Sequence, residues 1–364
     1  MNGTYRLARD IYYWIIGSVV NAAIVCTALL YGRAPRHIST VSTEVPVFIA
    51  AGKYSGFLAI LSILSLSRHI SELQFFVIDD GAMTWLQKWC LHLLQRVVPV
   101  TYIHPDVHKA PPQLRQYTRL KDMWKTGWVG RKFFVPRFTA EKYDRYIVVD
   151  CDTLFFSYPQ EIHDWIHKKQ ETCLYLDDYY NFTAVSTVEA EHIMNKRLTH
   201  QRFNSGFLCI YNVSYKKNNP LRLVNTYLDA IIEMLKDRMT RDYYRRPEYY
   251  YSLKLLEQTL YWMTMNNCVI NVLPSSYRLL HPEMSGQPVF VHFTPDSEEK
   301  HYEYRYLFRS LLTYVHDVIF RKPIVNPWYL YIDFIQYQRT YLTKDKFRSE
   351  EETFFGSMKL LLSD

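Results

Sequence analysis

The stretch KYDRYIVVDCDTLFFSYP, Lys142 to Pro159, joins an apolar segment to two aspartates that flank one cysteine. Its aromatic and β-branched run, Tyr146 to Val149, is typical of a buried strand. Asp150 and Asp152 follow at once, and the one-residue gap places both side chains on one face of an extended chain, about 7 Å apart. Each carboxylate then raises the cost of ionising the other, and a divalent cation would remove that cost. Two solvated turn acids are the alternative interpretation.

Strand-like and helix-like segments alternate before this stretch. Strands are expected within Val45–Gly56, Leu73–Gly81, Val98–Asp106 and Arg145–Asp152, with helices within Phe57–His69 and Met83–Val97. This order predicts a parallel sheet in a Rossmann-like α/β domain. Ligands of such open sheets bind at the carboxyl ends of the strands, so Asp150 and Asp152 would lie in a nucleotide-binding crevice.

Further elements are expected beyond the aspartate pair. The segments Thr172–Phe182, Ser205–Ser214 and Pro288–Thr294 predict strands, and Leu221–Asp237 predicts a helix. The tail from Tyr304 to Asp364 is helical and aromatic in parts, and it could pack on the domain, contact a membrane or bind a partner.

Composition fits one large globular domain or two small ones, since 48% of the 364 residues are hydrophobic and 22% are charged. The net charge of +7 suits an anionic ligand or a membrane surface, but no continuous basic block supports a nucleic-acid partner. The six cysteines are far apart and form no CxxC pair, which argues against a disulfide framework or a structural zinc site.

The N-terminal segment Ile11–Tyr31 is apolar and carries no charge over 21 residues. A helix of this length spans roughly 30 Å, the thickness of a bilayer core. A cleaved signal peptide and a buried core helix are the alternatives, and arginines on both sides of the segment leave its orientation open. We interpret it as an uncleaved signal anchor.

This interpretation divides the chain into a flank (1–10), a transmembrane anchor (11–31), a stem (32–44), a catalytic domain (45–302) and a C-terminal helical extension (303–364). With a cytoplasmic N-terminus the protein would be a single-pass type II membrane protein, in the Golgi or another secretory lumen if it is eukaryotic. The sequons Asn181-Phe182-Thr183 and Asn212-Val213-Ser214 could report that topology.

The aspartate pair would bind a hard cation, Mg²⁺ or Mn²⁺, which completes its shell with water and substrate phosphates. A diphosphate-bearing substrate follows from this chemistry. His292, in the strand-like VFVHF, is the plausible nitrogen ligand and would favour Mn²⁺, although a hydrogen-bonded core histidine is the alternative.

Several motifs occur in an order that resembles the glycogenin-like family of retaining glycosyltransferases, which has the A-type nucleotide-sugar transferase fold. The resemblance covers about Val45 to Tyr302, and its segments are VFIAAGKYSGFLAILSILSLSRH (47–69), YDRYIVVDCDTLFF (143–156), RFNSGFLCIYN (202–212), LEQTLYWMTMNNCVINVLPSSYRLL (256–280) and VHFTPDSEEKHY (291–302). It implies a Mn²⁺ (or Mg²⁺) cofactor, a UDP-sugar donor and a carbohydrate, glycoprotein or glycolipid acceptor.

The resemblance also implies roles for individual residues. Asp150, Asp152 and His292 would bind the metal, and Lys300 would contact the donor diphosphate. Either Arg131 or Lys132 in GRKFFVPRF would hold the diphosphate or the sugar.

Other positions would contact the nucleoside or the sugar. Ala50, Ala51 and Tyr54 would line the uridine pocket, although Gly52 or Lys53 replaces the aspartate that is usual in that turn. Asn204 and Gly206 would touch the donor sugar.

Three acids and one amide complete the expected site. Glu257 and Gln258 stand where the family has Asp-Gln beside the anomeric carbon, with a solvated helix acid as the alternative for Glu257. Asp177 and Asp178 are either sugar or acceptor contacts or two turn acids.

The predicted function is therefore a metal-dependent hexosyltransferase that retains the anomeric configuration, with Glu257 as the candidate nucleophile or with attack from the leaving-group face. A catalytically inactive relative that serves as a binding or scaffold protein is the alternative. A nucleotidyltransferase is a third possibility, but the chain lacks a Gly-rich, Lys-containing phosphate loop after its first strand.

Overall fold

The computed structural model describes residues 45–52, 55–67, 69–96, 98–106, 109–155, 157–178, 183–238, 255–279 and 289–292. The predicted anchor, stem and C-terminal extension lie outside these ranges. Among the helices that are described, none is both long and apolar enough to span a bilayer.

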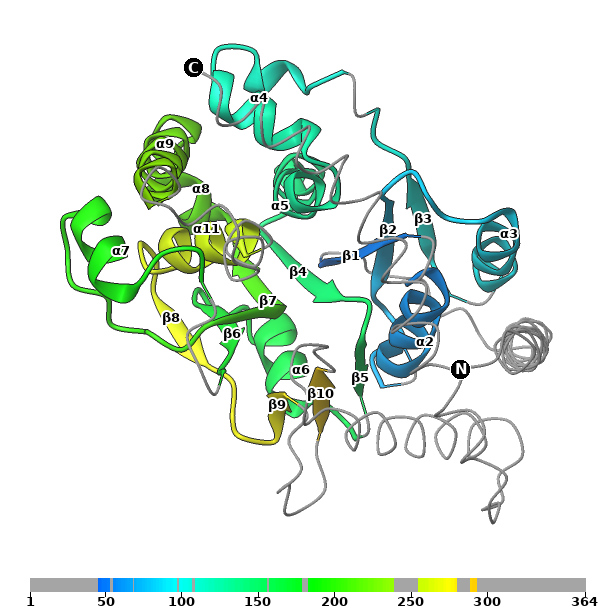
Figure 1. Cartoon of the computed structure of the whole chain (residues 1–364). Helices are drawn as coiled ribbons and strands as arrows, with labels where there is room; N and C mark the ends of the chain where they lie inside the picture. Colours follow the sequence, from blue (N-terminus) through cyan, green and yellow to red (C-terminus); the bar gives the residue numbers. More distant parts are fainter. Residues whose placement is uncertain are drawn as a thin grey trace, which may run out of the picture.

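A seven-stranded sheet forms the centre of the domain, in the order β3-β2-β1-β4-β7-β6-β8 (Figure 1). Its strands are β1 (Pro46–Ala51), β2 (Gln74–Asp79), β3 (Val100–Ile103), β4 (Arg145–Asp150), β6 (Cys173–Leu176), β7 (Asn204–Tyr211) and β8 (Ile270–Val272). The four strands β3, β2, β1 and β4 pair in parallel, as the sequence predicted. β7 runs antiparallel to both of its neighbours, β4 and β6, so the sheet is mostly parallel but mixed.

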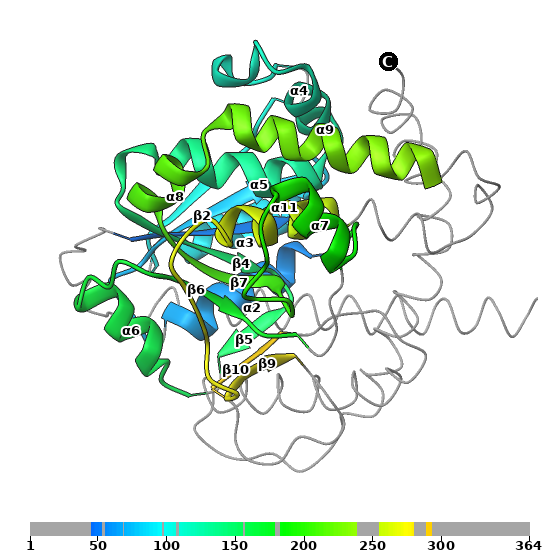
Figure 2. The same ribbon diagram turned by 90° about the vertical axis from the view of Figure 1, so that its left-hand side faces the viewer.

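Helices cover both faces of this sheet, with α2 and α5 on opposite sides of β1 (Figures 1 and 2). One layer contains α2 (Gly56–Ser67), α3 (Trp85–Leu94) and α6 (Gln160–His167), and the other contains α4 (Thr118–Lys125), α5 (Trp128–Thr139), α9 (Leu221–Arg238) and α11 (Leu256–Met265). The shorter elements are η1 (Pro112–Leu114), η2 (Ala140–Lys142), α7 (Thr187–Met194) and α8 (Asn212–Asn218).

Strand side chains alternate between the two apolar layers, which explains the continuous apolar runs in the sequence. In β2, Phe75 and Val77 join the cluster under α2 and α3, while Phe76 and Ile78 join the cluster under α5. A strand that is covered on both faces needs apolar residues at every position.

A second sheet of three short strands lies beside the carboxyl end of β4, in the order β5-β10-β9. It contains β5 (Thr153–Phe155), β9 (Tyr277–Leu279) and β10 (Phe290–His292). The predicted late strand therefore forms, and it belongs to this second sheet. Phe290 packs on Phe155 and Phe207, with ring centroids 4.9 and 5.2 Å apart, which joins the two sheets. The register pairs His292 with Thr153 and so brings the histidine to the aspartate pair.

Candidate metal centre and active site

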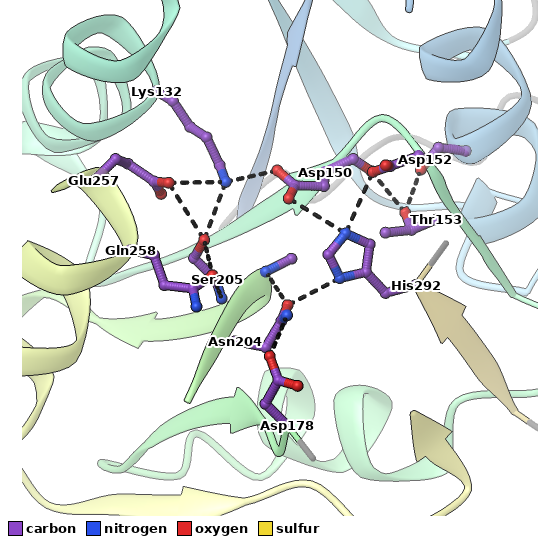
Figure 3. A network of polar contacts seen from close by, with 12 residues as sticks. Lys132, Asp150, Asp152, Thr153, Asp178, Asn204, Ser205, Glu257, Gln258 and His292 are labelled. Carbon is purple, nitrogen blue, oxygen red and sulfur yellow. Dashed lines mark hydrogen bonds and ion pairs between the residues drawn. The ribbon is translucent and has the colours of Figure 1, made fainter. Parts of the chain in front are cut away.

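Asp150, Asp152 and His292 meet at the carboxyl edge of the sheet (Figure 3). His292 Nε2 lies 3.5 Å from Asp150 Oδ2 and 3.3 Å from Asp152 Oδ1. One ligand atom from each residue lies within 4.8 Å of the others. Within the described part of the chain, this is the cluster of His, Cys, Asp or Glu side chains that could hold a metal ion. Two carboxylate oxygens and one imidazole nitrogen suit Mn²⁺ or Mg²⁺.

The electrostatics of His292 follow from its two acidic neighbours. Burial by itself would lower the pKa of the imidazole, but the carboxylates of Asp152 and Asp150 together raise it above 6.5. A divalent cation would compete with this proton, because both need the Nε2 lone pair.

Cys151 takes no part in the centre. Its side chain packs against the apolar cluster on the other side of β4, and burial together with the neighbouring aspartates raises the pKa of the thiol.

Of the two basic candidates on α5, Arg131 and Lys132, only Lys132 directs its side chain to Asp150 and Glu257. Its side chain is 4% exposed, and Nζ lies 2.7 Å from Asp150 Oδ1 and 3.2 Å from Glu257 Oε2. Burial opposes its charge, but Asp150 and Glu257 outweigh that effect and raise the pKa of the ammonium. Arg131 points elsewhere and donates to Asp79 O at the end of β2.

Local backbone geometry places Lys132 at this point. Gly127, at the start of α5, has φ 86°, a left-handed conformation that glycine adopts without a steric penalty. Gly127 lies in the short connection between α4 and α5, and Gly130 packs directly on the backbone of Met123.

Glu257 is a buried acid of the site, so the interpretation as a solvated helix acid is wrong. Its Oε2 contacts Lys132 Nζ and accepts from Ser205 Oγ at 3.3 Å. Its Oε1 is also buried and has no hydrogen-bond partner among the described residues. Burial raises the pKa of the carboxyl to about 7, although Lys132 acts in the opposite direction.

Gln258, the next residue on α11, holds the adjacent segment in place. Its Oε1 accepts from Ser205 N at 3.3 Å and from Ser205 Oγ at 3.2 Å, and its Nε2 donates to Phe203 O. Ser205 was not singled out from the sequence, although it stands in the Asn-Ser-Gly segment.

Asn204 and Gly206, expected at the donor sugar, lie against His292. Asn204 Oδ1 is 2.9 Å from His292 Nδ1 and accepts from Gly206 N at 2.7 Å. A Cβ on Gly206 would overlap the imidazole ring, so only glycine fits there. A contact of either residue with a sugar stays a prediction.

The two acids after β6 differ in environment. Asp178 is 4% exposed, and its Oδ2 accepts from Asn204 Nδ2 at 3.0 Å, so it is not a solvated turn acid. Asp177 is half-buried and forms an ion pair with Arg202.

The first strand carries two of the residues expected in the nucleoside pocket. Ala50 and Ala51 end β1, and Ala50 pairs with Asp150 in register. The side chain of Asp80, from the loop after β2, occupies the space that a Cβ on Gly52 would need. Glycine at this position thus admits a carboxylate from the loop that follows the neighbouring strand. Tyr54, Lys53 and Lys300 lie outside the described residues.

Comparisons with known proteins returned solved structures only. No family model and no curated protein matches the chain. Mouse xyloside xylosyltransferase 1 in its apo form is similar over 70% of this chain and 99% of that chain, with 13% identity and a TM-score of 0.46. Galactosyltransferase LgtC with donor and acceptor sugar analogs is similar over 69% and 87%, with 12% identity and a TM-score of 0.38.

Core-mannan synthase A from Aspergillus fumigatus, in a Mn/GDP form, is similar over 67% of this chain and 75% of that chain, with 9% identity and a TM-score of 0.43. All three are glycosyltransferases, the class that the sequence resembles, and they do not single out the glycogenin-like family. At this degree of similarity the function has to be argued from the residues of the site.

Proposed function

We propose that the chain is a metal-dependent glycosyltransferase that moves a sugar from a nucleotide-sugar donor, a UDP-sugar, to a hydroxyl group of a carbohydrate, glycoprotein or glycolipid acceptor. The observation that carries this proposal is the meeting of Asp150, Asp152 and His292 beside the buried Lys132–Glu257 pair. Residues 45–302 would form the catalytic domain.

The metal ion, once bound by Asp150, Asp152 and His292, supplies a Lewis acid for the departing diphosphate. Lys132 places a fixed ammonium next to Asp150, where it limits repulsion among the carboxylates and adds positive charge for an anionic donor. Its buried position keeps this charge poorly screened by water.

Glu257 is the residue proposed to act at the sugar with retention of configuration. Its Oε1 lacks a hydrogen-bond partner among the described residues, so a lone pair of this oxygen could accept from a sugar hydroxyl or attack the anomeric carbon. Glu257→Gln distinguishes a nucleophile from a hydrogen-bond acceptor at the sugar, because a covalent glycosyl intermediate requires the carboxylate. Mass spectrometry of protein quenched with donor would detect such an adduct.

Hydrolysis of nucleotide sugars tests the proposal directly. The full chain would be incubated with a panel of UDP- and GDP-sugars in Mn²⁺, Mg²⁺ or EDTA, and release of the nucleoside diphosphate would be measured. We expect metal-dependent release that Asp152→Ala lowers by a factor of at least 100, while Asp164→Ala, on the surface helix α6, leaves it unchanged. No release with any donor would favour the inactive scaffold protein instead.

We also propose that residues 11–31 anchor the chain as a type II membrane protein with its domain in the Golgi or another secretory lumen. Of the two sequons, Asn212 is unsuited as an acceptor: it is 1% exposed, and its Nδ2 donates to Ala140 O and Tyr143 O. Asn181 lies outside the described residues. Protease protection of the domain in microsomes would support this topology, and cleavage of the domain in intact microsomes would contradict it.

A further inference from the structure

We propose that Asp178 and Asn204 form a positioning relay that holds His292 with its hydrogen on Nδ1, so that Nε2 is free to bind the metal ion. This inference rests on the metal site of the proposed function. In this role both residues act through the histidine and are positioning residues.

The orientation of the Asn204 amide follows from its neighbours. A backbone N–H can only donate, so the atom that faces Gly206 N at 2.7 Å must be Oδ1. The atom that faces Asp178 Oδ2 at 3.0 Å is then Nδ2, which suits a carboxylate acceptor. Both neighbours therefore independently give the same orientation of the amide.

The tautomer of His292 follows from that orientation. Asn204 Oδ1 can only accept, and it lies 2.9 Å from His292 Nδ1, so Nδ1 carries the hydrogen. A neutral imidazole has one N–H, which leaves the lone pair on Nε2. Nε2 is the atom directed at Asp150 and Asp152, as Figure 3 shows.

Burial makes the relay effective. Asp178, Asn204 and His292 are each 5% exposed or less, so water cannot replace a lost hydrogen bond easily. The Asp178 carboxylate polarises the amide and strengthens Oδ1 as an acceptor. Gly206 lets the ring approach this closely, because the imidazole occupies the space that a Cβ would need.

The sheet explains how the relay is assembled. β6 and β7 pair antiparallel, with a register shift after Tyr175 that sets Leu176 opposite Asn204. Asp178, two residues beyond Leu176, is thereby brought within reach of the Asn204 amide. Asp177, between them, faces Arg202 instead and provides a matched control.

Mn²⁺ binding to the full-length protein, measured by isothermal titration calorimetry and electron paramagnetic resonance, tests the relay. Partners of this kind typically change metal affinity by about 10- to 100-fold. We expect Asn204→Leu to weaken binding by about that factor and Asp178→Asn by about 10-fold, with Asp177→Asn equal to wild type. His292→Ala marks the affinity without the nitrogen ligand.

A charge-conserving exchange separates positioning from folding. The double variant Asn204→Asp/Asp178→Asn keeps the net charge and a pattern of donors and acceptors that satisfies Gly206 N and His292 Nδ1. We expect it to bind Mn²⁺ more tightly than Asn204→Leu by about 10-fold. Thermal unfolding of each variant shows whether it is folded.

The tautomer itself is visible without metal or donor. In metal-free protein at pH 9 with ¹⁵N-labelled histidine, we expect His292 to show a protonated Nδ1, and Asn204→Leu to shift the population toward a protonated Nε2. Wild-type Mn²⁺ affinity in Asn204→Leu and Asp178→Asn, or an unprotonated Nδ1 in wild type, would overturn the relay. If wild type binds no Mn²⁺, the proposed function fails, and the tautomer still decides the relay.

Discussion

Replacement of Lys132 by methionine removes the buried cation that lies between Asp150 and Glu257 while keeping most of its volume. Breaking one side of a buried pair typically costs about 3–5 kcal/mol of unfolding free energy. We expect about 3 kcal/mol at pH 8, the low end, because Asp150 is 22% exposed and regains water. Glu257 has 3% exposure and no such relief.

The pH dependence of this loss can be worked out from Glu257. Its carboxyl has a pKa of about 7 beside Lys132, so at pH 8 it is mainly ionised and at pH 6 mainly neutral. In Lys132→Met the buried Glu257 carboxyl stays protonated, because an ionised carboxylate would have no cation beside it. Protonating this carboxyl costs about 1.4 kcal/mol at pH 8, one pH unit above its wild-type pKa, and almost nothing at pH 6. The difference between wild type and Lys132→Met should therefore shrink by about 1 kcal/mol between pH 8 and pH 6.

Urea unfolding of metal-free protein at pH 6, 7 and 8 measures this difference. In the background Glu257→Gln, Lys132→Met should lose the pH-dependent part of its effect. Lys125→Met removes a lysine that is 47% exposed from its pair with Asp122, and it should cost less than about 1 kcal/mol at every pH. A difference that is equal at pH 6 and pH 8, or one that keeps its pH dependence in the Glu257→Gln background, would refute the reasoning.

Three further predictions concern single residues. The pKa of Glu257 is raised from 4.5 to about 7 on folding, so its contribution to stability is present below pH 4.5 and is lost as pH rises through 7. This loss amounts to about 3 kcal/mol of unfolding free energy, and Glu257→Gln should abolish it in urea unfolding. Gly206→Ala should displace the His292 ring, with an unfolding cost of about 1–3 kcal/mol and a Mn²⁺ affinity at least 10-fold lower by calorimetry. Asn212→Ala should destabilise the domain by about 2 kcal/mol and leave its electrophoretic mobility unchanged after expression in secretory cells.

The sequence predicted six of the seven strands of the main sheet, all except β8, and the strand end at which the aspartates lie. Apolar runs that end in acids marked β2 and β4, because strands buried on both faces leave no ambiguity about their length. The order and direction of the strands in the sheet could not be predicted from these apolar runs. β7 is as apolar as its neighbours, and periodicity is the same in a parallel and an antiparallel strand.

The candidate site was predicted through resemblance more than through local pattern. Nothing near His292 in the sequence tells a ligand from a core histidine; the pairing of His292 with Thr153 makes that difference, and it joins segments far apart in the chain. Similarly, Asp178 reads as a turn acid until the register of β6 and β7 brings it to Asn204. Burial decided the interpretation of Glu257 in the same way.

The charges of the site bear on the choice between an enzyme and a scaffold. Asp150 and Glu257 share Lys132, Asp152 lies beside His292, and burial raises the pKa of the Glu257 carboxyl to about 7. Neighbouring carboxylates repel each other, and a divalent cation would relieve this repulsion between Asp150 and Asp152. A domain kept only for binding through its surface would gain stability from neutral residues at these positions. The presence of all three acids, with a histidine oriented toward two of them, therefore favours a site that is completed by a metal ion.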